Sequence, residues 1–212
     1  MCKYIKRLYF VSYRYMSGSG HSLKSRLLAL FLLNLLPFSV LADTVTDNQQ
    51  PESNIKQYTY EVVNVYPHDP TAFTQGLIYQ DGYLYESTGL NGRSSLRKIK
   101  LETGKVLKKK NINRKYFGEG LASDDGYLVQ LSWRAGTGFV YNRDTFALEK
   151  KFNYPGEGWG LTTYKGHLIM SDGSSTLRFL DPVHFKEIRQ LHVSIDGKPL
   201  KKIDCAKIYF ID

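Results

Sequence analysis

Cysteine is nearly absent from this sequence: Cys2 and Cys205 lie close to opposite ends of the 212 residues. We expect the N-terminal segment that contains Cys2 to be removed, which leaves one thiol and excludes an internal disulfide bond. A cysteine-based metal site is excluded for the same reason. The four histidines beyond that segment show no close ligand spacing, and we expect them on the surface or in turns: His68, His167, His184 and His192. The sequence therefore predicts no metal site.

Acidic residues are absent before Asp43, whereas six basic residues occur there. The apolar run LLALFLLNLLPFSV occupies residues 27–40, and Ala42 follows shortly after it. A basic segment, a short apolar run and a small-residue exit are typical of a secretory signal. A membrane-spanning helix needs about twenty apolar residues, so this run is short for one. We expect residues 1–42 to be a signal peptide with an N-terminal extension, cleaved after Ala42; a retained anchor is the alternative.

The net charge of +9 does not indicate a nucleic-acid partner. The chain has 29 basic and 20 acidic residues, and removal of the six basic residues before Asp43 leaves 23 against 20, or +3. The local basic run KVLKKKNINRK at residues 105–115 is typical of a solvated strand and loop. We therefore expect an exported protein, periplasmic or secreted, with no nucleic-acid partner and no stable membrane association after cleavage.

Apolar stretches long enough for helices are missing after the signal, and residues 43–57 are polar without periodicity, which predicts a linker. The remaining residues, 58–212, contain a repeat of about forty residues. A Gly-Leu pair and a turn glycine each recur at spacings of 44 and then 40 residues: Gly76, Gly120 and Gly160, and Gly82, Gly126 and Gly166.

Each repeat contains about four short strands separated by turns. The turns include Asp81–Gly82 and Asp125–Gly126, and Asp-Gly is a favoured sequence for a tight hairpin. Four short strands in about forty residues are typical of one blade of a β-propeller. The sequence therefore predicts an all-β propeller domain over residues 58–212. A β-sandwich is the rival fold, but it does not explain motifs that recur at fixed spacing.

The residue before each Gly-Leu pair differs between repeats: it is Gln75, then Glu119, then Trp159. Equivalent positions in successive blades lie on one ring around the propeller axis. Three chemically unlike side chains on one ring predict a single binding site there. The alternative is that each side chain only packs within its own blade, although similar apolar residues would then be expected.

Several motifs, in order, resemble the plant and bacterial glutaminyl-peptide cyclotransferases, and the resemblance runs from about Tyr60 to Ile203. They are VVNVYPHDPTAFTQG and FTQGL, which overlap, followed by YESTGLNGRSSLRKI, YFGEGL, GWGL and SDGSSTLRFLDP. The resemblance implies a five-bladed β-propeller that works without a metal or other cofactor. It implies an acyltransferase that converts the N-terminal glutamine of peptides or proteins to pyroglutamate and releases ammonia. It also implies Glu119 as the catalytic carboxylate, and the substrate-binding residues Phe73, Gln75, Phe117, Trp133 and Trp159.

Cyclisation of glutamine needs mainly proton transfer and positioning. The substrate's α-amine attacks its own γ-carboxamide carbon, so the nucleophile is already tethered. One carboxylate can take the amine's proton and then give a proton to the leaving nitrogen. Glu119 suits this role. Glu86, in the YESTG motif, is a second carboxylate within a predicted strand, and we expect a structural or supporting role for it.

The sequence departs from the family after Ile203. The family's next ring position carries an asparagine in a motif close to NELE, whereas this chain reads DCAKIYFID from Asp204 to Asp212. The family's later pocket tryptophan and a lysine also have no counterpart here. We therefore expect an incomplete propeller of about three and a half blades. An inactive peptide-binding or interaction module, or a chain that does not fold stably, remains an alternative to an active enzyme.

Overall fold

The computed structural model describes residues 7–15 and 58–203. The expected apolar signal run, the cleavage point after Ala42, the linker at 43–57 and the divergent residues 204–212 lie outside the described residues. The chain divides into two compact units, residues 10–64 and residues 1–9 with 65–212. The described residues form no helix that is long and apolar enough to cross a membrane.

A two-stranded sheet contains β1 (Arg7–Tyr15) and β2 (Tyr58–Pro67). β1 falls inside the range that we expect to act as signal and extension, where the sequence predicted no strand. β2 begins where the predicted propeller domain begins. The second sheet of two strands is the short hairpin of β15 (Ser194–Ile195) and β16 (Lys198–Pro199).

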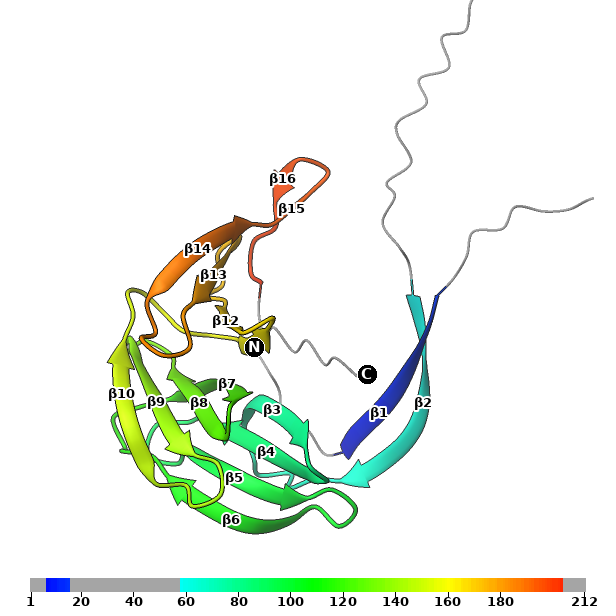
Figure 1. Ribbon diagram of the computed structural model, residues 1–212. Coiled ribbons are helices and arrows are strands. Elements are labelled where there is room, and N and C mark those ends of the chain that lie inside the picture. The colour runs from blue at the N-terminus through cyan, green and yellow to red at the C-terminus, as the bar shows by residue number, and fades with distance from the viewer. Residues whose placement is uncertain (1–6, 16–57, 204–212) are drawn as a thin grey trace, which may run out of the picture. The chain divides into compact units, whose positions relative to one another are not determined.

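Three four-stranded antiparallel sheets follow one another along the chain (Figure 1). In each sheet the strands are paired in chain order, so each sheet is one repeat of the sequence. The first sheet contains β3 (Thr74–Gln80), β4 (Tyr83–Thr88), β5 (Ser95–Lys100) and β6 (Lys105–Asn111). The second contains β7 (Gly118–Asp124), β8 (Tyr127–Ser132), β9 (Thr137–Asn142) and β10 (Leu148–Asn153). The third contains β11 (Leu161–Tyr164), β12 (His167–Met170), β13 (Thr176–Leu180) and β14 (Glu187–His192). The predicted all-β fold with four strands per repeat is confirmed, and the described residues hold three such blades.

Each blade begins with the tight hairpin that the sequence predicted. Asp81 and Gly82 both have positive φ angles, 52° and 79°, and Asp125 and Gly126 have 39° and 79°. Two consecutive positive φ angles are the geometry of a type I′ turn, whose twist matches that of the flanking strands. The third blade turns in the same way although Lys165 replaces the aspartate, with φ 48°.

The recurring glycines of the Gly-Leu pairs allow the first strands of successive blades to lie close together. A Cβ atom on Gly76 would lie 2.6 Å from the backbone nitrogen of Leu121. A Cβ atom on Gly120 would lie 2.5 Å from the backbone oxygen of Trp159. The Gly120 N–H donates to that same oxygen at 2.7 Å. These contacts place β3, β7 and β11 side by side, and they explain why glycine occupies positions 76 and 120.

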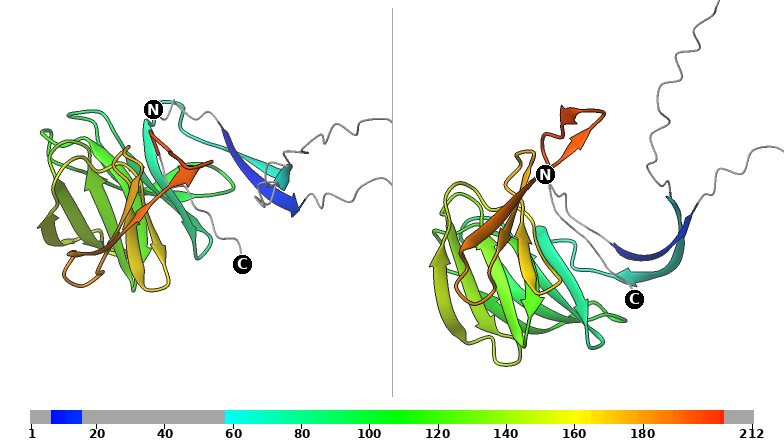
Figure 2. Two further views of the ribbon diagram at one scale, coloured as in Figure 1. Left: turned by 90° about the horizontal axis from the view of Figure 1, so that it is seen from above. Right: turned by 45° about the horizontal axis from the view of Figure 1, so that its top comes forward.

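The hydrophobic core lies between successive blades. One buried cluster joins the first two blades and includes Tyr85, Leu96, Leu121 and Phe139. A second cluster joins the second and third blades and includes Leu131, Phe152, Leu168 and Met170. Figure 2 shows the blades from two further directions.

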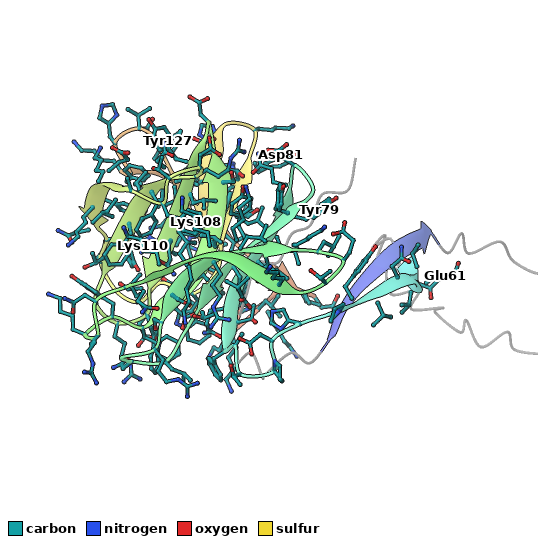
Figure 3. The ribbon with its side chains drawn as sticks, turned by 90° about the horizontal axis from the view of Figure 1, so that it is seen from below. Glu61, Tyr79, Asp81, Lys108, Lys110 and Tyr127 are labelled. Carbon is teal, nitrogen blue, oxygen red and sulfur yellow. The ribbon has the colours of Figure 1, made fainter. Side chains whose placement is uncertain are left out.

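The last strand of each blade is the most exposed one. β14 is exposed along its whole length, and in β10 only Phe152 is buried. In β6 exposed and half-buried residues alternate, and its lysines include Lys108 and Lys110, which are labelled in Figure 3. Charged residues on such edges oppose pairing with other strands. The prediction that this basic run forms a solvated strand agrees with the exposure of β6.

Candidate functional site

Gln75 on β3 and Glu119 on β7 lie against each other at the first strands of their blades. The Gln75 Nε2 group donates a hydrogen bond to Glu119 Oε2 at 2.7 Å. Both side chains are buried, with 9% and 8% of their surface exposed. A buried carboxylate needs hydrogen-bond donors to replace water, and Gln75 supplies one. Two of the three predicted ring residues are therefore in direct contact.

Three of the predicted aromatic residues form a continuous series beside this pair. The rings of Phe73 and Phe117 meet edge to face with centroids 6.0 Å apart. Phe117 and Trp133 meet in the same way at 5.6 Å. All three residues are only partly buried. Edge-to-face packing fixes the rings relative to one another.

Gly89 connects the Gln75–Glu119 pair to the aromatic series. A Cβ atom at Gly89 would overlap the ring of Phe117 and would lie 3.1 Å from Gln75 Cγ. Gln75 and Phe117 therefore both pack on the same bare backbone. This contact brings Phe117, which directly precedes β7, next to Gln75 on β3, the residue whose amide holds the buried carboxylate.

Glu157 joins the two tryptophans, and the sequence analysis missed it. Its Oε2 atom accepts hydrogen bonds from Trp133 Nε1 at 2.6 Å and from Trp159 Nε1 at 2.9 Å. Its Oε1 atom accepts one from Arg134 Nε at 3.2 Å. The hydrogen bond from Trp159 is the largest cause that lowers the pKa of Glu157 below its usual value, and those from Trp133 and Arg134 add to it. A sequence signal did exist, because residues 156–158 repeat the Gly-Glu-Gly triplet that surrounds Glu119.

Trp159 is also placed by contacts on its other sides. Gly173 lies against the indole, and a Cβ atom there would lie 2.6 Å from Trp159 Cη2. The Trp159 backbone N–H donates to the Ser171 carbonyl oxygen at 2.9 Å. The contact between the second and third ring positions runs through the backbone, from Gly120 N–H to the Trp159 oxygen.

Tyr154 holds the chain at the end of β8, next to Trp133. Its hydroxyl donates to the Ser132 carbonyl oxygen and accepts from the Ser132 backbone N–H at 3.0 Å. Burial raises the pKa of Tyr154 to about 12, and the nearby charge of Glu119 acts in the same direction. The neutral phenol is therefore the form that supports this strand end at neutral pH.

Glu86, on β4, lies in a separate buried cluster next to Thr74 of β3. Its Oε1 atom accepts from Thr74 Oγ1 at 2.6 Å and lies 2.8 Å from His68 Nε2. Its Oε2 atom lies 3.6 Å from Arg97 Nη1. These contacts fit the structural role that the sequence predicted for Glu86. We expected His68 on the surface or in a turn. It follows the end of β2, outside any strand, but a surface position is wrong: only 6% of this residue is exposed, because its ring packs beside the Glu86 carboxylate.

The structure brings the predicted site residues into one region of the domain. Gln75 contacts Glu119, Phe73 contacts Phe117, and the two tryptophans share Glu157. A carboxylate held by an amide beside aromatic rings can exchange protons with a ligand that stacks on those rings. The described residues contain no group of three or more His, Cys, Asp or Glu side chains that could hold a metal ion. The roles of the individual residues stay predictions.

Known proteins match this chain along much of its length. The family model for glutamine cyclotransferases matches residues 35–207. A glutaminyl-peptide cyclotransferase of Arabidopsis thaliana is 42% identical over 146 residues, which are 68% of this chain and 46% of the relative. The crystal structure of the glutaminyl cyclase of Myxococcus xanthus superposes with a TM-score of 0.61 at 37% identity. That match covers 66% of this chain and 59% of the other chain. The chain thus spans about half the length of the Arabidopsis relative.

Proposed function

Since this chain belongs to the glutamine cyclotransferase family, we propose that it converts N-terminal glutamine of peptides or proteins to pyroglutamate. The hydrogen bond between Gln75 and Glu119 is the observation that supports this activity most directly. The donor is a neutral amide, and its hydrogen bond fixes the orientation of a carboxylate that can still accept a proton. The names of the relatives support the same reaction.

In this proposal Glu119 transfers the proton that the cyclisation moves. The α-amine nitrogen of the substrate forms a bond to the γ-carboxamide carbon, and the bond from that carbon to the amide nitrogen breaks. Glu119 accepts a proton from the attacking amine and returns it to the departing nitrogen, which leaves as ammonia. Proton balance is complete within the site, and the reaction needs no oxidant or reductant.

The aromatic side chains position the substrate in this proposal. Phe73, Phe117, Trp133 and Trp159 offer apolar faces for the aliphatic part of glutamine and for the next residue of the peptide. They also exclude water from the reacting atoms. Because the nucleophile is already part of the substrate, orientation of the amine towards the carboxamide carbon is the main task left for these rings.

The test is release of ammonia from a glutamine-initiated peptide by the purified chain. We expect release from the free peptide and none from the same peptide with an acetylated α-amine. The Glu119→Gln variant should lose about 10²- to 10⁴-fold in rate, the usual range for a general acid or base. The matched control is Glu149→Gln on the exposed strand β10, which should keep full activity.

A folded wild-type chain that releases no ammonia would contradict the proposed activity. Circular dichroism and a monodisperse elution profile establish the folded state in the same sample. Peptide binding without turnover, unchanged in Glu119→Gln, would instead support the alternative of a peptide-binding module.

We also propose that the protein is exported, because residues 1–42 combine a basic segment with a short apolar run. N-terminal sequencing of the protein recovered from its native compartment tests this. We expect Asp43 as the first residue. A mature protein that retains the apolar run would contradict cleavage and support the anchor.

A further inference from the structure

Glu157 lies in the loop between the second and third blades, where one carboxylate oxygen accepts two indole N–H groups. Trp133 follows β8 of the second blade, and Trp159 precedes β11 of the third. Their Nε1 atoms lie 2.6 Å and 2.9 Å from the same Oε2 atom. The distance from Trp159 is in the range of charge-assisted hydrogen bonds, and the distance from Trp133 is slightly shorter than that range. The two indoles therefore share one acceptor although they belong to different blades.

The surroundings keep this carboxylate in place. The backbone N–H of Gly158 donates to the Trp133 oxygen at 2.9 Å, and Gly158 packs against the hydroxyl of Tyr154. On the other side of the carboxylate, Arg134 pairs with Oε1 at 3.2 Å. The Arg134 guanidinium also lies 3.9 Å from the centre of a Trp133 ring. Loop backbone, cation and both indoles thus converge on one side chain.

We propose that Glu157 is a positioning residue that holds Trp133 and Trp159 as one rigid binding surface, and that its ionised carboxylate is the form that holds both indoles most strongly. The hydrogen bonds from the two indoles to Glu157 support the positioning role by themselves. The importance of Glu157 for catalysis rests on the proposed function, in which these indoles bind the glutamine end of a peptide.

Charge matters because an indole N–H is only a donor. An ionised carboxylate oxygen can accept two such donors, whereas protonation turns one oxygen into a donor and weakens the acceptor. Hydrogen bonds from Trp159, and then from Trp133 and Arg134, lower the pKa of Glu157 from its ordinary 4.5. The double hydrogen bond therefore has its full strength at neutral pH and weakens only as the pH falls below that ordinary value.

Other charged groups near this loop have partners of their own. Arg178 on β13 donates to the Pro155 oxygen at 2.9 Å and pairs with Glu187 at 2.7 Å. Tyr154, with its pKa raised to about 12, stays neutral throughout the acidic range.

The nearby carboxylates also have hydrogen-bond donors. Asp172 directly precedes Gly173, which packs on Trp159, and the Asp172 carboxylate accepts from the Ser174 backbone N–H at 3.0 Å. Glu119 is the buried carboxylate held by Gln75. Arg134 is the cation that contacts Glu157 directly.

The chain has two tryptophans, so its proton–nitrogen NMR spectrum contains two indole N–H peaks, one for each residue of interest. As the pH is lowered, we expect both peaks to shift together with one midpoint below 4.5, the ordinary pKa of glutamate. In Glu157→Gln neither peak should show this step. In the control Glu149→Gln, which alters an exposed strand residue in the same chemical way, both should keep it. A step that persists in Glu157→Gln, or two different midpoints, would overturn the proposal.

A comparison at neutral pH covers the case in which the chain unfolds in acid before the midpoint. In Glu157→Leu both indole peaks should move and both tryptophans should become more accessible to a soluble fluorescence quencher. If both peaks stay at their wild-type positions while circular dichroism shows an intact fold, Glu157 does not position the indoles.

Kinetics then connect the positioning to the proposed activity. In Glu157→Gln we expect KM for a glutamine-initiated peptide to rise about tenfold with a smaller change in kcat, as for the loss of one charge-assisted hydrogen bond. An unchanged KM would remove the catalytic part of the inference. If the wild type releases no ammonia but both indoles titrate with Glu157, the proposed function fails and the positioning role stands.

Discussion

The side-chain amide of Gln75 donates a 2.7 Å hydrogen bond to the carboxylate of Glu119, across 44 residues and between two blades. The sequence predicted Gln75 as a substrate-binding residue, and that role stays a prediction. The contact adds a second role, because the Gln75 amide fixes the orientation of the Glu119 carboxylate. A substrate that approaches the carboxylate therefore meets a prepositioned acceptor.

Replacement of Gln75 by methionine should lower kcat/KM about 10- to 100-fold, since a hydrogen bond to a charged group contributes about 1.5 to 3 kcal/mol. Methionine keeps similar bulk and removes the donor, so Glu119 loses its orientation while the packing on Gly89 persists. Ammonia release from a glutamine-initiated peptide measures the loss. The variant Gln80→Met, at the far end of β3, is the control and should behave as wild type. Equal activity of both variants would contradict the role of Gln75.

Replacement of Gly120 by alanine should lower the free energy of unfolding by about 2 to 3 kcal/mol, as overpacking of a rigid site does. The new Cβ atom would lie 2.5 Å from two backbone atoms of the neighbouring blade, Leu161 N and Trp159 O, which cannot rotate away. Urea unfolding measures the change. Gly126→Asn is the comparison, because that turn glycine has open space around it and asparagine tolerates its positive φ. A smaller loss for Gly120→Ala than for Gly126→Asn would refute close approach of the blades as the reason for glycine.

Replacement of Glu86 by leucine should cost about 3 kcal/mol or more of stability. It removes the acceptor of Thr74 Oγ1 and the carboxylate beside the buried His68 ring, whereas Arg97 keeps its closer partner, Asp69, at 2.9 Å. Glu86→Gln should cost less, because the amide oxygen can still accept one hydrogen bond. The exposed Glu102→Leu variant should change stability by less than about 0.5 kcal/mol. Denaturant unfolding of the three variants tests this order, and equal stability of Glu86→Leu and Glu102→Leu would disprove it.

Alkaline pH should destabilise the protein through Tyr154. Its pKa is about 12 in the folded state against 10.0 ordinarily, so the folded form holds the phenol proton more tightly. The resulting stability is complete below pH 10 and decreases as the pH rises towards 12, by about 2 kcal/mol at that point. The Tyr154→Phe variant should be less stable than wild type at neutral pH, because the Ser132 backbone N–H loses its acceptor. Its free energy of unfolding should decrease less than that of wild type as the pH rises. Some slope should remain, since burial raises the pKa of Tyr141 as well. Identical pH profiles of wild type and variant would contradict the assignment.

The fold could be predicted from local patterns in the sequence. Repeated Gly-Leu pairs and turn glycines recur at fixed spacing, and the hairpins at Asp81–Gly82 and Asp125–Gly126 depend only on neighbouring residues. In a propeller each sequence repeat forms one four-stranded blade, so a regular local pattern predicts a regular series of blades. For this reason the four strands of each blade, and the common location of Gln75 and Glu119, followed from spacing alone.

Contacts between side chains of different blades could not be predicted in this way. The sequence marks Glu157 only as a second Gly-Glu-Gly triplet, and nothing in the local pattern states that two indoles from separate blades meet it. Nor does it show that His68 turns inward to Glu86, since that contact depends on how a loop packs on β4. Local backbone chemistry determined the strands and turns of this protein. Which polar atoms become neighbours was decided by the packing of one blade on the next, because burial forces each donor to find an acceptor across that interface.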